Sequence, residues 1–153
     1  MKIHIGPYRK NRRVDVRIDK YDTWSMDSTL ALIILPMLKQ LKETKHGSPY
    51  VDDEDVPPEY RDVNEKIHEA WDWVMGEMIW AFEQKCRDDW ESDYQIEEGE
   101  LGEPIEVEID GQILHEMNWV KEPVWDWDGR QAHQDRMSNG FRLFGKYYEG
   151  LWD

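Results

Sequence analysis

The stretch from Arg61 to Lys85 repeats apolar side chains at the spacing of an α-helix. Its apolar stripe has a member every three or four positions, at Val63, Ile67, Trp71, Val74, Met78 and Phe82. Apolar residues also occupy the other faces, at Trp73, Met75, Ile79 and Trp80. A helix that is apolar on most sides has to be covered on most sides. We therefore expect this helix, residues 61–87, to lie at the centre of the fold.

Two acidic residues, Asp72 and Glu77, lie within this apolar stretch. A carboxylate that enters a core must be paired, or its pKa rises until the group is neutral. A later helix, expected near residues 129–148, has a polar side that could supply the cations: Arg130, His133, Arg136, Asn139, Arg142 and Lys146. We expect an arginine of this side, Arg136 or Arg142, to pair with Glu77.

Such a buried network has two interpretations. It is either a structural pair within the core, or one wall of a pocket in which a small ligand, such as a nucleotide base, stacks on an indole ring. The residues that would form the pocket are Asp72, Trp73, Glu77, Trp80, His133, Arg136 and Asn139. The sequence alone does not choose between the two.

Composition argues against several classes of protein. The chain has 153 residues, enough for one domain, 1–153, with a hydrophobic core. A formal net charge of −15 argues against direct binding to nucleic acids and to anionic membranes. The single cysteine, Cys86, excludes an internal disulfide and a cysteine-based zinc site. No signal peptide and no apolar run of bilayer length is found, so the cytoplasm is the expected location.

Alternating apolar and polar residues predict four short strands, at residues 2–5, 14–18, 105–109 and 112–116. Asp110-Gly111 joins the last two and is a strong hairpin signal. A helix is expected to begin after Ser25 or Asp27, with a kink or a break at Pro36. Together these elements predict an α+β fold, with three main helices and a small antiparallel sheet built from the four strands.

Charge is distributed unevenly along the chain. A basic cluster lies between the first two strands, at Arg9, Lys10, Arg12, Arg13 and Arg17. It is either a solvated turn that keeps edge strands from pairing, or a contact for an anionic ligand or for the acidic middle of the same chain. From Asp88 to Val120 there is no Lys or Arg, while twelve residues are acidic. We expect an irregular loop as far as Gly102. The acidic stretch is either a soluble surface or a mimic of phosphate groups.

Clustered acids in the loop 44–60 suggest a cation site, because Ca²⁺ and Mg²⁺ prefer several oxygen ligands. The spacing of an EF-hand is absent. Glu65 and His68 have the spacing of a di-metal ligand pair, but no second copy of that pair occurs. A mononuclear site would use His68 with Asp72, joined by His46 or His133 and by acids of the 52–55 loop such as Asp52 and Asp53. The alternative is a solvated acidic loop without a metal.

Several long motifs resemble a family of proteins encoded by tailed bacteriophages. They are IHIGPY, KYDTWSMDSTLALIILPMLKQLK, TKHGSPYVDDEDVP, WDWVMGEMIWAFEQK and SNGFRLFGKYYEGLWD. Together they cover about half of the chain. Members of this family carry a long helical insertion after IGPY, whereas only RKNRRVD follows here, so no role of the insertion can be transferred. The resemblance implies a phage origin and production inside a bacterium, but no activity and no catalytic residues.

These observations favour a non-enzymatic accessory protein without a cofactor. Such a protein would bind a host or viral protein through its acidic surface, or would sequester a small molecule, in the cytoplasm of the infected bacterium. A metal-dependent hydrolase or nuclease that uses a divalent metal is the first alternative. A structural component of the virion is the second.

Overall fold

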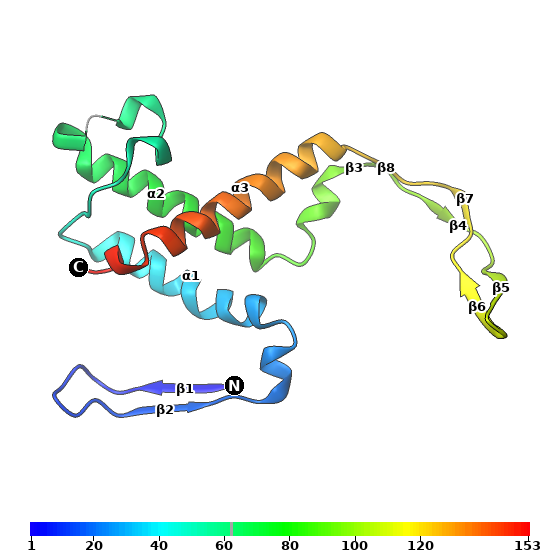
Figure 1. Ribbon diagram of the computed structural model, residues 1–153, viewed down its shortest axis with the longest axis horizontal. Helices are drawn as coiled ribbons and strands as arrows, with labels where there is room; N and C mark the ends of the chain where they lie inside the picture. The colour runs from blue at the N-terminus through cyan, green and yellow to red at the C-terminus, as the bar shows by residue number, and fades with distance from the viewer. Residues whose placement is uncertain (62) are drawn as a thin grey trace. The chain divides into compact units, whose positions relative to one another are not determined.

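The computed structural model describes residues 1–61 and 63–153, and omits the side chains of Val63 and Asn64. Val63, the first member of the predicted stripe, thus lies outside the described side chains. The fold is α+β, as predicted (Figure 1). Its main helices are α1 (Met26–Thr44), α2 (Val63–Lys85) and α3 (Trp127–Lys146). Short 3₁₀ helices occupy Lys20–Thr23, Asp53–Asp55, Pro58–Tyr60, Trp90–Tyr94 and Tyr148–Gly150.

The described residues group into two compact units. The core unit comprises Met1–Cys86 and Met137–Asp153, and the arm unit comprises Arg87–Arg136. Helix α3 begins in the arm unit and ends in the core unit. Each unit is described separately below.

Helix α2 is the centre of the core unit, as the apolar residues around its circumference predicted. Trp71, Val74, Met75 and Met78 on α2 are fully buried, together with Leu143 on α3. Phe82 packs edge to face against both Phe141 and Phe144, with ring centroids 5.1 Å apart in each pair. α2 is therefore covered by α1 on one side and by the last part of α3 on another.

Helix α1 runs through Pro36 without a break, so of the two predicted outcomes, a kink or a break, the break is excluded. Proline removes one backbone hydrogen bond within a helix, here to the carbonyl of Leu32. Both Pro36 and Leu32 are exposed, so that carbonyl can bond to water instead. Leu38 and Ala31, on the buried side of α1, keep the helix packed against the core.

The first two predicted strands form a hairpin in the core unit. β1 (Lys2–Ile5) pairs with β2 (Val14–Arg17) in an antiparallel register that places Ile3 opposite Val16 and Ile5 opposite Val14. The connecting loop is closed by Gly6, whose N–H donates to the Arg13 carbonyl over 2.9 Å. Arg12 Nε donates to the Gly6 carbonyl over 2.8 Å. We call residues 2–17 the basic hairpin.

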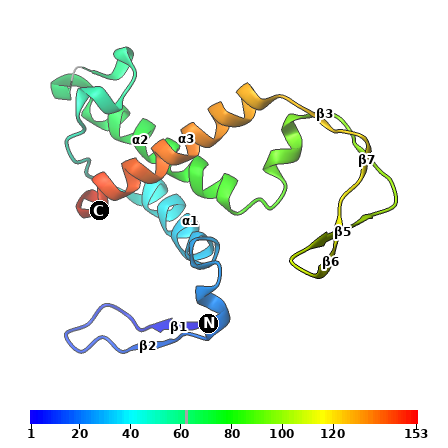
Figure 2. The same cartoon turned by 45° about the vertical axis from the view of Figure 1, so that its right-hand side comes forward.

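Three strand pairs in the arm unit form a long two-stranded ribbon (Figures 1 and 2). β3 (Gln95–Glu97) pairs with β8 (Val124–Trp125), β4 (Glu100–Leu101) with β7 (Trp119–Lys121), and β5 (Ile105–Ile109) with β6 (Gln112–Glu116). Asp110 and Gly111 form the turn at its tip, with φ of 52° and 76°. We call residues 95–125 the acidic arm.

Two details of the predicted sheet were wrong. The predicted strands belong to separate two-stranded sheets in the described part of the chain, rather than to one sheet. The stretch to Gly102 is not an irregular loop, because it contains β3 and β4. Their partners, β8 and β7, follow some twenty to thirty residues later, so no local pattern reveals the pairing.

Candidate functional site

The acidic loop 52–55 closes around a cation of the protein itself. Lys146 Nζ lies 2.7 Å from Asp52 Oδ2, 2.6 Å from Asp55 Oδ2 and 3.2 Å from Glu54 Oε1. These carboxylates raise the pKa of Lys146, with the hydrogen bond to Asp52 as the largest cause. The loop therefore contributes to packing of the chain's last helix.

Asp55 is the buried member of this group, with 2% of its side chain exposed. Arg142 Nη2 donates to its Oδ1 over 2.6 Å, and the Tyr147 hydroxyl donates to its Oδ2 over 2.7 Å. Burial alone would raise the pKa of Asp55, but the hydrogen bonds from Lys146, Tyr147 and Arg142 outweigh it and lower the pKa. Burial and the hydrogen bond to Asp55 raise the pKa of Tyr147 to about 12.

The residues predicted to bind a metal do not all meet. Among the described residues, the acids that come together are Asp52, Glu54 and Asp55, whose ligand atoms lie within 4.8 Å of one another. Asp53 is not part of that group. His46 Nδ1 instead lies 2.9 Å from Asp153 Oδ1, and His68 Nδ1 lies 2.9 Å from Ser48 Oγ.

The ammonium of Lys146 supplies the positive charge that a divalent cation would supply to this group. The sequence placed Arg142 and Lys146 on one polar side of helix α3, but the prediction directed that side to Asp72 and Glu77 rather than to Asp55. Arg142 and Lys146 are four residues apart on one helix, so both point to the same side. They lie opposite Asp55 in the folded chain, at a sequence separation too large for spacing to reveal.

Asp72, one of the two acids predicted for a buried pocket, is compensated by two lysines. Lys45 Nζ lies 2.9 Å from Asp72 Oδ1, and Lys42 Nζ donates to the Asp72 carbonyl over 3.0 Å. The Asp72 side chain is 49% exposed. Its partners thus come from the end of α1. The prediction that α3 would supply them was wrong. Arg142, one of the two arginines expected to pair with Glu77, is bound to Asp55.

The other predicted pocket residues are distributed over both units. Trp73, Glu77 and Trp80 are half-buried on α2. Asn139 Oδ1 accepts a hydrogen bond of 3.0 Å from Arg142 Nε. His133 and Arg136 belong to the arm unit.

His133 has its own aromatic surroundings within the arm unit. Its ring stacks on Trp90 with centroids 4.4 Å apart and an interplanar angle of 10°. Its Nδ1 lies 2.8 Å from the Tyr94 hydroxyl. Burial lowers the pKa of His133, as do the nearby charges of Arg87 and Arg136. A neutral imidazole with these partners is a packing element at the base of the arm.

The acidic arm is the part of the chain with the largest exposed charge. Its 31 residues contain nine carboxylates and one lysine, Lys121, which pairs with Glu97 at 2.7 Å. All nine carboxylates are exposed. Glu106 and Glu108 are two residues apart on β5, so they share one face of the tip. Their partners on β6, His115 and Ile113, lie on the same face. This face offers a row of negative charge.

The opposite face of the tip is mainly aliphatic, with Glu116 and Gln112 opposite Ile105 and Ile109. Ile105, Val107 and Ile109 on β5 point to one side, together with Leu114, the partner of Val107. About half of each isoleucine's surface and of Leu114's is accessible to solvent. None of the residues from 95 to 125 is buried. The arm thus combines exposed carboxylates with exposed aliphatic groups, which is the composition of a binding surface rather than of a core.

An apolar hollow of about 620 Å³ is a second candidate, within the core unit. Its lining is Leu30, Ile34, Met37, Leu38, Leu41, Phe144, Tyr148 and Leu151. Leu30 and Met37, both on α1, are exposed. Hollows of this size and lining are typical of small-molecule sites.

Comparisons with protein-family models, with curated proteins and with solved structures found no match. In the described residues no helix combines the length and the apolar character needed to cross a bilayer.

Proposed function

We propose that this chain is a phage-encoded, non-enzymatic accessory protein that binds a basic surface of a host or viral protein through its acidic arm. The observation that carries the proposal is the arm itself, which presents nine exposed carboxylates against one lysine and buries no residue. The phage origin rests on the motifs described above.

The charge of the arm determines which partners it fits. A ribbon with this excess of carboxylates attracts Lys- and Arg-rich surfaces and repels nucleic acids. Glu106 and Glu108 are two residues apart on a strand, so their carboxylates are spaced by about 7 Å along it. Regularly spaced carboxylates suit a protein surface that normally binds phosphate groups. Ile113, which lies on the same face as Glu106 and Glu108, would add affinity by burial.

A site-specific photo-crosslinker tests this proposal. The reactive residue replaces Ile113, at the tip of the arm, or Leu32, on α1, which are 65% and 68% exposed. In lysate of the infected host, the Ile113 position should give a covalent product with a basic protein, identified by mass spectrometry. The Leu32 position should not give this product. Irradiation in about 0.5 M salt should not give it from the Ile113 position either.

Two double variants, each of which removes two negative charges, complete the experiment. Glu106→Gln with Glu108→Gln should weaken the crosslink at Ile113 about tenfold or more, since both charges face the partner. Glu43→Gln with Glu69→Gln changes two exposed acids of the core unit and should have no effect. Equal crosslinking from both positions, or a product that persists in high salt and in the arm variant, would contradict the proposal.

The apolar hollow of the core unit supports a second candidate function, sequestration of a small apolar molecule. Its eight lining residues include no charged group. Native mass spectrometry of protein purified from infected cells should show a retained mass, lost when Leu41→Glu places a charge in the hollow. A wild-type mass equal to the polypeptide alone would contradict this function.

A further inference from the structure

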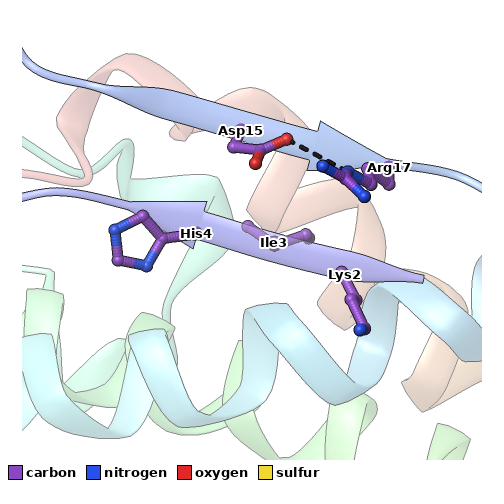
Figure 3. Close-up of a pocket in the computed structure, with 5 residues that line it drawn as sticks. All are labelled: Lys2, Ile3, His4, Asp15 and Arg17. Atoms are coloured by element: carbon purple, nitrogen blue, oxygen red, sulfur yellow. Dashed lines mark ion pairs between the residues drawn. The ribbon is translucent and has the colours of Figure 1, made fainter.

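The chain carries a second hairpin whose charge is opposite to that of the arm. The basic hairpin contains six Lys and Arg residues and one acidic residue, Asp15. Its polar face presents Lys2, His4 and Arg17 around a shallow hollow, with Arg17 Nε 3.5 Å from Asp15 Oδ1 (Figure 3). More cations lie in its loop, at Arg9, Lys10, Arg12 and Arg13.

The basic hairpin also has an uncovered apolar face. The register of β1 and β2 places Ile3, Ile5, Val14 and Val16 on one side. All four are exposed, by 42% to 60% of their surface. The tip of the acidic arm has the same construction, with Ile105, Val107, Ile109 and Leu114 on one side. Each hairpin therefore presents four aliphatic side chains, and the two carry opposite charge.

We propose that the basic hairpin of one copy packs its apolar face on the apolar face of the arm tip of a second copy. Two sheets that pack face to face bury both inner faces. A lone two-stranded hairpin is marginally stable in water, so each would gain from the other. Arg9, Lys10 and Arg13 would then neutralise carboxylates of the arm. This inference rests on the proposed function, because it uses the same arm as the binding surface.

Opposite charge selects this pairing over the alternatives between copies. Two arms, with nine carboxylates each, repel one another, as do two basic hairpins. Each copy offers one hairpin of each kind, so a copy bound through its basic hairpin still offers its arm. Such a head-to-tail contact lets a chain of copies grow. The contact area of two short hairpins lies below about 1,200 Å², so an affinity in roughly the micromolar range is expected.

Sedimentation velocity of the full chain tests the inference. At low salt, the average sedimentation coefficient should rise as protein concentration increases from about 10 to about 500 micromolar, and the rise should vanish in about 0.5 M salt. Val14→Thr with Val16→Thr makes one apolar face polar while keeping β-branched residues. Ile105→Thr with Ile109→Thr does the same in the arm. Each variant alone should be monomeric.

Mixing the two variants gives the sharpest result. One variant retains a working arm and the other retains a working basic hairpin, so the mixture should form a one-to-one dimer that does not grow. Glu116→Gln removes the carboxylate that lies opposite Ile105, on the packed face of the arm, and should weaken self-association about tenfold. Glu43→Gln, at an exposed acid of the core unit, should leave it unchanged. A wild-type chain that is monomeric at every concentration, or a mixture that stays monomeric, would overturn the inference.

Two further outcomes separate this inference from the proposed function. In the first, the amides of β1 and β2 are protected from hydrogen exchange in the wild-type monomer and lose that protection in Ile105→Thr with Ile109→Thr. In that case the two hairpins pair within one chain, and the proposed contact between two copies is wrong. If self-association is absent but the Ile113 crosslink to a different basic protein persists, the inference fails and the proposed function stands. If neither is observed, both fail.

Discussion

The core unit and the acidic arm use apolar residues for different purposes. In the core unit, Trp71, Met75 and Leu143 are fully buried between helices. In the arm, Ile105, Ile109 and their neighbours are held by a two-stranded ladder and remain about half accessible. Burial of apolar surface is the main source of folding stability. The free energy of unfolding should therefore depend on the core unit, whereas recognition should depend on the arm.

Charged residues differ between the two regions in the same way. Acids of the core unit have cations as close partners: Asp55 with Arg142 and Lys146, Asp72 with Lys45, and Glu83 with Lys39 at 2.7 Å. The arm has one cation for nine acids. Charge is thus balanced where the chain packs and unbalanced where it is open to a partner.

The largest effect on stability should come from the centre of the core. Trp71 is fully buried, and its ring packs edge to face on Tyr147 with centroids 5.9 Å apart. Trp71→Ala should lower the free energy of unfolding by about 3–5 kcal/mol, because it removes a large buried ring and leaves a cavity. Urea denaturation followed by circular dichroism measures this. Trp119→Ala, in the arm, is the matched control and should cost less than about 1 kcal/mol. Equal costs would contradict the division of roles.

The next effect concerns the buried carboxylate of Asp55 and depends on pH. Asp55→Asn should lower the free energy of unfolding at neutral pH by about 2–3 kcal/mol, since it removes a buried charge that three groups bind. The folded state lowers the pKa of Asp55. Its contribution to the free energy of unfolding is therefore complete above the pKa that this carboxyl has in the unfolded chain, about 3.9. It is lost as the pH falls through the lower folded value.

Denaturation of both proteins at several pH values checks this prediction. The difference between wild type and Asp55→Asn should be constant from neutral pH down to about 5 and should shrink below about 4. Asp53→Asn changes the exposed neighbour and should have no effect at any pH. A difference that stays constant in acid would mean that packing, and not charge, is what Asp55 contributes.

The sequence predicted what is local and missed what depends on distant partners. Helical periodicity located α2, and Asp110-Gly111 located the tip of the arm. Helix α3 begins at Trp127 rather than Gly129, because Asp126 Oδ1 accepts the Gly129 N–H over 2.9 Å and caps the helix. That cap was readable in the sequence.

The candidate sites were harder to predict than the helices. Charge composition alone identified the acidic stretch, and the ladder then showed that its tip has separate acidic and apolar faces. The surroundings of Asp55 could not be predicted, because Arg142 and Lys146 are about ninety residues away. Any cation of the chain could have filled that place, so only the packing of α3 decides it.

A smaller effect is expected where α3 crosses α2. A Cβ atom added to Gly140 would overlap the Ala81 side chain and would lie 2.7 Å from the Glu77 carbonyl. Gly140→Ala should therefore cost about 1–3 kcal/mol, because the helices must move apart. Gly145, on the same helix, has nothing within 4 Å of its added Cβ. Gly145→Ala should instead stabilise the protein by about 0.5–1 kcal/mol, since alanine favours the helix. Thermal unfolding of both variants measures the signs. Destabilisation by Gly145→Ala would show that helix propensity does not determine the change in stability at this position.

The smallest effect on stability belongs to the surface with the largest expected effect on binding. Glu106→Gln with Glu108→Gln removes two exposed charges from a ribbon that buries no residue. The free energy of unfolding should change by less than about 0.5 kcal/mol, as for other exposed substitutions. Urea denaturation of the double variant beside wild type measures it. The same variant should weaken the Ile113 crosslink about tenfold. A variant that lost binding and also lost more than about 1 kcal/mol would show that the arm contributes to folding, and the separation of stability from recognition would not hold.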